Sequence, residues 1–374
     1  MSAMHTTATP HAGFSGSYRA DDVRFLLTPI GLAPILDLDE KERLIQSGQR
    51  HYSEMLSPES LPSDAYLGLF RSAYAANRLQ MARDCLRLAA LIAARRAGPI
   101  TLVSLARAGT PVGVILGHLL RRVFGRDCSH YSVSIIRDRG IDAVALRHIL
   151  ASGHSPESVV FIDGWTGKGV IARELRQAVA GFNALHGVAL DGGLYVLSDL
   201  AGAAACAASG ADYLIPSSIL NATVSGLVSR SVLNQAIGPD DFHGCVYYEQ
   251  FAAHDQSRRF ADGLVADGVA LAASEGVPAP RAVDAQAMAA VSAAYMAGAR
   301  ERYGIADINL IKPGIGEATR VLLRRVPERL ILRDSDAPDV AHLRLLAAEK
   351  SIPVSLEPAL PYQAVALIRS AVDG

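Results

Sequence analysis

Five short apolar runs that alternate with helical segments constrain the fold of this 374-residue chain more than any other feature. The runs lie at 99–106, 130–136, 158–163, 192–199 and 212–217. Helical patterns lie between them at 111–124, 142–151, 168–186 and 199–209. Short strands separated by helices predict an α/β domain with a parallel sheet wound on both faces. A long Ala/Leu/Arg helix at 64–97 precedes the first run.

A second, smaller α/β pattern follows an Ala-rich helical stretch. It reads INLIKPG, a helix at 315–325, the strand RLILRDSD, a helix at 337–350, the strand IPVSLEP and a helix at 361–370. The length also favours two domains. We therefore expect a flexible tail at 1–17, a large domain at 18–261 with an N-terminal helical hood that includes a helix at 41–55, a helical connector at 262–302 and a small α/β domain at 303–374.

Composition excludes several protein classes. Lys and Arg (36) balance Asp and Glu (37), so the whole chain has no electrostatic drive toward nucleic acid or acidic membranes. The first residues lack the basic and apolar regions of a secretory signal, and no apolar run is long enough to span a membrane. Four scattered cysteines without CxxC spacing favour reduced thiols and predict a cytoplasmic protein without a structural zinc site.

Two strand ends carry residues suited to anions. After the first strand, Ala106, Arg107, Ala108 and Gly109 open a helix, so that backbone N–H groups and the Arg107 guanidinium are available. A plain turn with a surface arginine explains this loop equally well. Because ligands bind at the carboxyl ends of parallel strands, an anion site is the working hypothesis.

The loop after the third strand is more specific. Four apolar residues lead to Asp163 at the predicted strand end, and a Thr-Gly-Lys-Gly segment enters the next helix. The helix N-terminus favours a phosphate, and Asp163 suits ribose hydroxyls or Mg²⁺. The loop lacks the Walker A pattern. The candidate phosphate and ribose residues are Asp163, Gly164, Trp165, Thr166, Gly167, Lys168 and Gly169.

These two loops resemble those of type I phosphoribosyltransferases. The resemblance implies pyrophosphate at 106–109 and a ribose 5-phosphate at 163–169, in the family's order along the chain. The second acidic residue that usually adjoins Asp163 is absent, and Gly169 replaces a closing Thr or Ser. Binding of the 5′-phosphate is therefore implied more strongly than contacts to both ribose hydroxyls.

Most of the chain resembles a narrower family, the phosphoribosyltransferase-like proteins of tellurite-resistance and stress gene clusters, which often carry the name cysteine protease StiP. The resemblance covers roughly residues 15–260. It is carried by His51-Tyr52-Ser53-Glu54, SLARAGTP, IIRDRGID, FIDGWTGKG and IPSSILNATVSGLVSRSVLN. The end of the chain resembles a pelota-type RNA-binding domain.

Arg137 and Arg139 lie where type I phosphoribosyltransferases have a mobile loop over the transition state. An arginine pair suits the charge that develops on departing pyrophosphate. The alternative is a solvated turn in which Asp138 and Asp142 pair with the two arginines.

A run dense in hydroxyl and amide groups follows the fifth predicted strand. Such a surface could bind the polar edge of a base or other acceptor. The candidate acceptor residues are Ser217, Asn221, Ser225 and Arg230. A capped helix with serines on its wet face explains the run nearly as well.

His51 and the His243/Cys245 pair are weaker candidates. His51 could act as an acid or base, but a single histidine beside aromatic residues is more often structural. His243 and Cys245 are the only sequence basis for a protease. Two residues of spacing do not make a catalytic dyad, and the apolar surroundings of Cys245 predict a buried strand.

In the small domain, Arg320, Arg324 and Arg325 cluster on one helical turn shortly after Lys312. Pelota-type domains use such a segment to grip bent RNA, and flanking cations can hold its phosphates. A solvated helix is the alternative. Aromatic residues are nearly absent here, which argues against reading of unpaired bases.

The leading hypothesis is a phosphoribosyltransferase that moves a (phospho)ribosyl group from a phosphoribosyl diphosphate or nucleotide-like donor to a base-like acceptor. Its catalytic residues would be Arg107, Arg137, Arg139 and Asp163, with Mg²⁺ at Asp163. The alternatives are a nucleotide-binding regulator that docks RNA without turnover and, less favoured, a cysteine protease. A homodimer is one option for the assembly, which the sequence leaves open.

Overall fold

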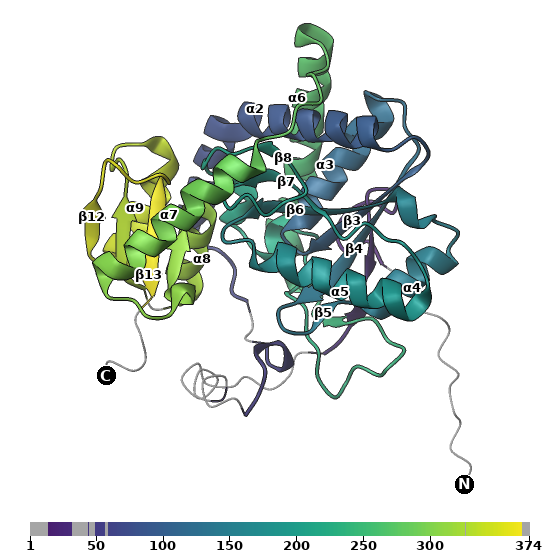
Figure 1. Cartoon of the computed structure of the whole chain (residues 1–374), viewed down its shortest axis with the longest axis horizontal. Helices are drawn as coiled ribbons and strands as arrows, with labels where there is room; N and C mark the ends of the chain where they lie inside the picture. Colours follow the sequence, from purple (N-terminus) through teal and green to yellow (C-terminus); the bar gives the residue numbers. More distant parts are fainter. Residues whose placement is uncertain (1–13, 32–43, 45–48, 57–58, 326, 369–374) are drawn as a thin grey trace.

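The computed structural model describes residues 14–31, 44, 49–56, 59–325 and 327–368 (Figure 1). Most of the predicted tail lies outside these residues, and so do 41–43 and 45–48 of the predicted helix at 41–55. Within the latter, Tyr52–Glu54 forms a 3-10 turn, η1. None of the described helices is long and apolar enough to cross a membrane.

The predicted parallel sheet of the large domain is confirmed. Its path is β1-β4-β3-β6-β7-β8, with all neighbours parallel, and β5 pairs antiparallel with β4. The strands are Arg24–Leu26 (β1), Ile100–Ala106 (β3), Cys128–Ile136 (β4), Gly140–Ile141 (β5), Val159–Thr166 (β6), Leu194–Asp199 (β7) and Cys206–Ser209 (β8). A separate short ladder joins Thr28–Pro29 (β2) and Gly244–Cys245 (β9).

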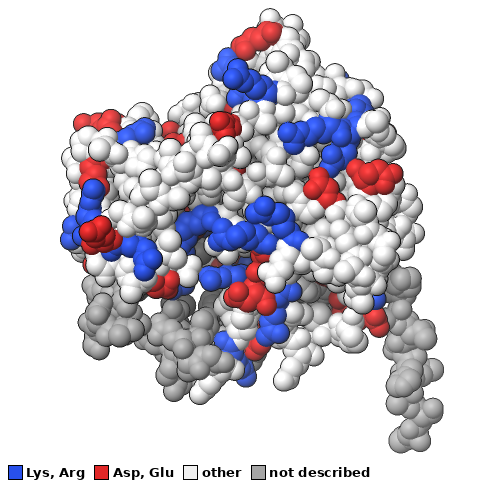
Figure 2. All heavy atoms as spheres, in the orientation of Figure 1, with Lys and Arg blue, Asp and Glu red and all other residues white. Residues whose placement is uncertain are grey.

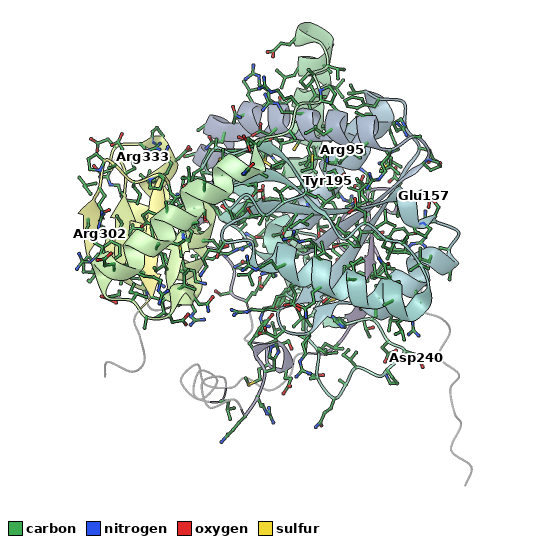
Figure 3. All side chains as sticks on the ribbon, in the orientation of Figure 1. Arg95, Glu157, Tyr195, Asp240, Arg302 and Arg333 are labelled. Carbon is green, nitrogen blue, oxygen red and sulfur yellow. The ribbon has the colours of Figure 1, made fainter. Side chains whose placement is uncertain are left out.

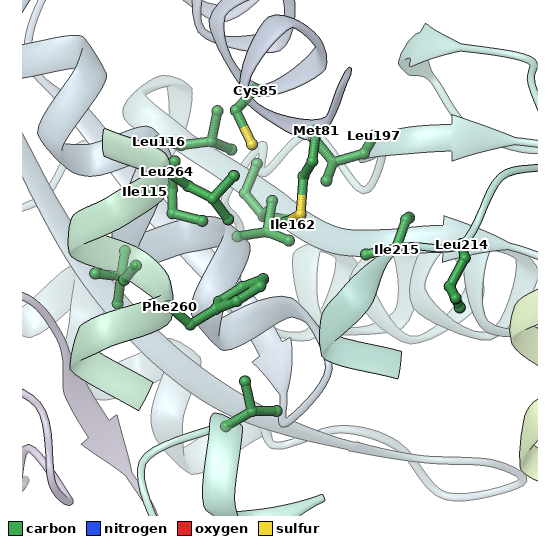
Figure 4. Close-up of a cluster of buried hydrophobic side chains, with 14 of the residues drawn as sticks. Met81, Cys85, Ile115, Leu116, Ile162, Leu197, Leu214, Ile215, Phe260 and Leu264 are labelled. Carbon is green, nitrogen blue, oxygen red and sulfur yellow. The ribbon is translucent and has the colours of Figure 1, made fainter. Parts of the chain in front are cut away.

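Helices cover both faces of this sheet (Figure 1). One face carries Asp64–Arg95 (α2), Gly109–Arg122 (α3) and Ser257–Glu275 (α6), and the other carries Ala143–Ala151 (α4) and Val170–His186 (α5). Figure 4 shows the core under α2, where Met81, Ile115, Ile162 and Phe260 meet. Each fully buried side chain of this size stabilises the fold by about 1.5–3 kcal/mol relative to exposure.

The order of the strands creates a switch point at β3. The next long strand along the chain, β4, lies on one side of β3, and β6 lies on the other. The connection from β3 runs to one side, and the next connection crosses back past β3 to β6 on the other side. In open α/β sheets a ligand binds at the carboxyl ends of the strands at such a point.

The smaller C-terminal domain is a mixed four-stranded sheet with helices, in agreement with the α/β prediction. Its order is β10-β13-β11-β12, and only the β11–β12 pair is parallel. The strands are Ile311–Pro313 (β10), Pro327–Leu332 (β11), Val354–Leu356 (β12) and Ala364–Ile368 (β13). Ile315–Arg324 (α8) and Ala341–Glu349 (α9) cover one face, and Ala285–Tyr303 (α7) covers the other.

Two predicted elements at the edge of the large sheet are wrong. The run at 212–217 is not a strand; the edge strand is β8, inside the stretch predicted as a helix at 199–209. Its small alanine side chains let α2 approach closely, and Arg87 and Arg95 donate to the carbonyls of Ala208 and Ala205 at 3.0 and 3.4 Å. The tertiary setting therefore overrides the helical propensity of alanine.

The predicted helix at 361–370 contains strand β13. All five residues of this strand are buried, because β10 and β11 flank it and helices cover both faces. A short apolar run that is buried all round cannot be assigned to helix or strand by periodicity alone. Strand β6 also continues past Asp163 to Thr166, three residues beyond the predicted end at 163.

A buried carboxylate joins the two domains. Asp212 accepts hydrogen bonds from the backbone N–H groups of Ile315, at the start of α8, and Gln363, at 2.9 and 2.8 Å. Burial raises the pKa of Asp212 to about 6. Nearby, Asn77 of α2 donates to Asp339 of the C-terminal domain at 2.8 Å.

We expect Asp212→Ala to weaken the docking of the C-terminal domain, since two shielded N–H groups lose their acceptor at about 1–3 kcal/mol each. Thermal unfolding should split into two transitions, and a protease should cut the largely exposed 276–282 segment faster. Asp336→Ala, at a carboxylate whose side chain is 90% exposed, is the matched control. Equal cleavage of the two variants would show that Asp212 does not hold the domains together.

Candidate functional site

A cavity of about 320 Å³ lies at the switch point of the sheet. Its walls come from the ends of β3, β4 and β6, from the polar run after β8, and from two segments distant in sequence, near η1 and in α8. The polar residues that line it are Tyr52, Arg107, Asp163, Trp165, Ser217, Ser218, Asn221, Ser225, Arg230 and Arg320. The site predicted from strand ends and the acceptor candidates therefore share one cavity.

Asp163 supplies the carboxylate of the cavity. It accepts a hydrogen bond from the N–H group of Gly164 at 2.8 Å. Burial raises the pKa of Asp163 to about 6, and the nearby Arg320 guanidinium opposes this rise. The carboxyl group can consequently change its charge close to neutral pH.

Arg107 is held rigidly in the opposite wall. Its guanidinium forms an ion pair of 2.5 Å with Glu59 and donates to the Val228 carbonyl at 2.8 Å. Glu59 also accepts from the N–H group of Ala222 at 3.1 Å. The sequence prediction missed Glu59, since nothing in its local pattern distinguishes it from a surface acid.

The four acceptor candidates all line the cavity. The run forms two 3-10 turns, Pro216–Ser218 (η3) and Ala222–Val224 (η4), so the alternative of a capped α-helix is wrong. Arg230 donates to the carbonyls of Tyr52, at 3.0 Å, and Met55. Its Nη1 and the Ser218 Oγ are shielded from solvent and have no hydrogen-bond partner among the described residues, although buried polar groups normally have one.

The Thr-Gly-Lys-Gly loop lies partly under the C-terminal domain. The Thr166 hydroxyl donates to Asp199, and the Lys168 ammonium donates to the Ile308 carbonyl at 2.8 Å. Burial and the neighbouring Lys312 lower the pKa of Lys168 to about 8. Gly169 begins α5 with a left-handed φ of 70°. Phosphate binding by this loop stays a prediction.

Arg137 and Arg139 lie in the tight turn between β4 and β5, and their side chains are 45% and 49% exposed. Arg137 pairs with Asp138 and Arg139 with Glu54, each at 3.5 Å. Asp142 instead caps α4 by accepting from Val144 and Ala145. The Arg137–Asp138 pair agrees with the alternative of a solvated turn, whereas Asp142 has another role. A catalytic role for the two arginines stays a prediction.

The RNA candidates with described side chains, Lys312, Arg320 and Arg325, differ in exposure. Arg320 lies over the Trp165 ring, 4.5 Å from its centre, and lines the cavity. Lys312 is half-buried, and burial lowers its pKa. Arg325 is exposed, whereas the side chain of Arg324 is outside the described part of the chain. Figure 2 shows a band of Lys and Arg over the first half of α5, beside the C-terminal domain.

The thiols are enclosed in the core. The exposed fractions of Cys85, Cys128, Cys206 and Cys245 are 0, 6, 3 and 0%. Burial raises the pKa of Cys128 and of Cys245 to about 12. His243 Nδ1 lies 2.8 Å from the Ser134 Oγ, and His51 Nδ1 lies 2.7 Å from the Ser53 Oγ, which gives both rings structural partners.

The residues around Asp163 fit Mg²⁺ only together with a ligand. In the described ranges, no group of three or more His, Cys, Asp and Glu residues could hold a metal ion. Mg²⁺ usually binds through one or two carboxylates plus substrate phosphates and waters. Asp163 could supply one oxygen, and a diphosphate would have to supply others.

Comparison with known proteins gives two matches along the chain. Residues 16–265 match the family described as tellurite-like stress resistance cysteine protease StiP, and residues 290–370 match the PELOTA RNA binding domain. A protein of Acinetobacter baylyi named cysteine protease StiP is 42% identical over 377 residues. The match covers 97% of this chain and 96% of that protein.

Reaction with a thiol reagent tests the enclosure of the cysteines. In the native protein, Ellman's reagent should modify all of them far more slowly than free cysteine, because burial keeps them protonated and out of contact. Unfolding in denaturant should release all four. One thiol that reacts at the rate of free cysteine in the native protein would contradict the arrangement.

The raised pKa of Asp163 predicts a pH-dependent stability. The folded state keeps this proton up to about pH 6, whereas the unfolded chain loses it near pH 4, so this group's contribution falls as the pH rises between them. Asp163→Asn should therefore unfold at a higher temperature than wild type at pH 7, with the gap closing below about pH 4. Asp240→Asn, whose side chain is 92% exposed, should track wild type throughout. A constant gap at every pH would contradict the assignment.

Proposed function

The chain belongs to the StiP family and carries a PELOTA RNA-binding domain, and from this premise we propose that its large domain is a phosphoribosyltransferase-type enzyme. The observation that carries the proposal is the position of the cavity, at the carboxyl ends of β3 and β6 where the strand order reverses. Its charged groups are one carboxylate, Asp163, and the guanidinium groups of Arg107, Arg230 and Arg320. These groups suit a small molecule that bears both hydroxyls and phosphates.

In the proposed reaction the bond between the anomeric carbon of the ribose and the diphosphate breaks, and a bond to the acceptor forms. The ribose becomes positively charged while the diphosphate takes up the electron pair. Ionised Asp163 would stabilise the sugar, and Arg107 would orient the diphosphate. Mg²⁺, when bound with the diphosphate, would neutralise part of its charge. The proton released by the acceptor would pass to solvent or to a carboxylate of the cavity.

The acceptor would occupy the side of the cavity formed by the 217–230 run. Ser217, Asn221 and Ser225 offer short polar groups, and Arg230 closes this end under the Tyr52 ring, with 5.6 Å between guanidinium carbon and ring centre. A ligand oxygen near Arg230 Nη1 or Ser218 Oγ would give these shielded donors a partner. A base-like edge with carbonyl oxygens meets this requirement.

Proteolysis, the activity in the family's printed name, finds little support in this chain's thiols. A cysteine nucleophile needs a stabilised thiolate within reach of a base. Cys245 is fully buried, its pKa is raised, and the ring of its neighbour His243 is held by Ser134. We therefore place the chemistry at Asp163 in our proposal, with RNA as a partner of the C-terminal domain.

Binding of phosphoribosyl diphosphate with Mg²⁺ tests the proposal directly. Calorimetry should show binding to wild type, and Asp163→Ala should weaken it about 10- to 100-fold, the effect of losing one charged hydrogen-bonding group. Asp240→Ala, at the exposed carboxylate labelled in Figure 3, removes the same charge outside the cavity and should bind like wild type.

Turnover separates the enzyme from the regulator. Release of pyrophosphate with at least one base of a panel, lost in Asp163→Ala, would support the enzyme. Binding without release across the panel would favour a nucleotide-binding regulator. No binding of phosphoribosyl diphosphate to wild type would exclude both.

A further inference from the structure

The C-terminal domain contributes charged side chains to the site of the large domain. We propose that Arg320 of α8 is an anion-binding residue of the cavity, and that Glu317 occupies its guanidinium until a phosphate or diphosphate replaces the carboxylate. The reacting ligand rests on the proposed function, whereas the anion site itself can be tested without it. Neither residue adjoins the large domain's motifs in sequence.

Arg320 is oriented by two contacts. One face of its guanidinium lies on the Trp165 ring at 4.5 Å, and its Nη1 donates to Glu317 Oε1 at 2.9 Å. Its side chain is 37% exposed and lines the cavity, close enough to Asp163 to oppose the rise in the pKa of that carboxyl group. A stacked guanidinium with five N–H donors is preorganised for a planar or tetrahedral anion.

Glu317 lies over the loop that the sequence suggests for phosphate. A Cβ atom added to Gly167 would lie 2.5 Å from its Cγ, so this glycine allows the close approach. The Glu317 charge also reaches Lys168 and Lys312, and it raises the pKa of both ammonium groups against the effect of burial. Glu317 thus partly neutralises three cations, Arg320, Lys168 and Lys312, and Asp307 adds a second negative charge near the two lysines.

Such a cluster favours exchange of the carboxylate for a stronger anion. A phosphate carries more charge and more acceptor oxygens than a carboxylate, and it can bind the same cations at once. Two further cations lie near, since Arg137 acts on Lys168 and Lys312 electrostatically and Arg325 acts on Lys312. Exchange would also move the negative charge of Glu317 away from the cations, which would then be available to the ligand.

The position of Arg320 depends on the docking of α8. A Cβ atom added to Gly316 would lie 2.5 Å from Cε2 of Trp165, so the first turn of α8 packs directly on this ring. Asp212 accepts from the N–H group of Ile315 in the same turn. The large domain therefore fixes α8 at both its backbone and the Arg320 side chain.

Titration with inorganic pyrophosphate, alone and with Mg²⁺, tests the proposal by calorimetry. Arg320→Ala should bind about 10- to 100-fold more weakly than wild type, and Arg320→Lys should recover part of the loss. Glu317→Gln should bind about 3- to 10-fold more tightly, because it frees the guanidinium and removes a repelling charge. Arg302→Ala is the control, since Arg302 pairs with Glu357 at 2.7 Å on the outer side of the same domain (Figure 3).

The opposite signs are the signature of an anion site. If the Glu317–Arg320 pair only stabilised α8, both substitutions would weaken binding alike, and the proposal would be overturned. An Arg320→Ala variant that binds like Arg302→Ala would overturn it as well. Limited proteolysis of each variant at 276–282 verifies that the domains remain docked, and Arg320→Lys serves as the test if Arg320→Ala undocks.

The two proposals fail in different ways. Pyrophosphate binding that depends on Arg320, together with no binding of phosphoribosyl diphosphate, would support the anion site and reject the proposed reaction. If wild type and Arg320→Ala bind phosphoribosyl diphosphate with the same affinity, the anion site at Arg320 is rejected and the proposed function is supported. No binding of either probe to wild type would reject both.

Discussion

The packing of α8 against the end of β6 determines what the site contains. Trp165 is the central residue of this contact, because the backbone at Gly316 lies on its ring and the Arg320 guanidinium stacks over it. In the resemblance to type I phosphoribosyltransferases, this loop lacks the usual second acid. Here the aromatic ring gives the loop a surface on which another domain can place a cation. The site is therefore built by two domains, although the large domain alone holds the sheet and its switch point.

Two of the three arginines of the cavity are paired with carboxylates. Arg107 pairs with Glu59 and Arg320 pairs with Glu317, and each partner comes from a segment outside the sheet. An unpaired charge that is shielded from water is costly, so such pairing is expected where the side chains are partly buried. An anion that binds to these arginines must therefore either displace the two carboxylates or share the guanidinium groups with them. The near-zero net charge of the chain, −1, gives no further attraction at long range.

The sequence predicted the sheet well, and it predicted several of the residues that line the cavity. The runs at 99–106 and 158–163 are continuous and apolar because both faces of a parallel sheet are covered, and this signal is local. Asp163 and Arg107 could be found because they come at or just after such runs. The 217–230 run was found through its hydroxyl and amide groups, although the strand predicted before it does not form. Glu59 and the role of Arg320 could not, since their partners lie far away in sequence and share no periodicity with them. The misassigned β8 and β13 were decided by neighbours in space, which alanine-rich and short apolar runs do not reveal.

The two-domain site links the fate of the domains to that of the ligand. A ligand that contacts both Asp163 and Arg320 binds only when the two domains are docked. Ligand binding therefore stabilises docking, and docking stabilises ligand binding by the same free energy. The reverse also follows. Any partner that draws α8 away from Trp165 removes a cation from the cavity and exposes the Thr-Gly-Lys-Gly loop. For an RNA-binding domain attached to the proposed small-molecule site, this contact is the place where one binding event can alter the other, and the coupling needs no change within the parallel sheet.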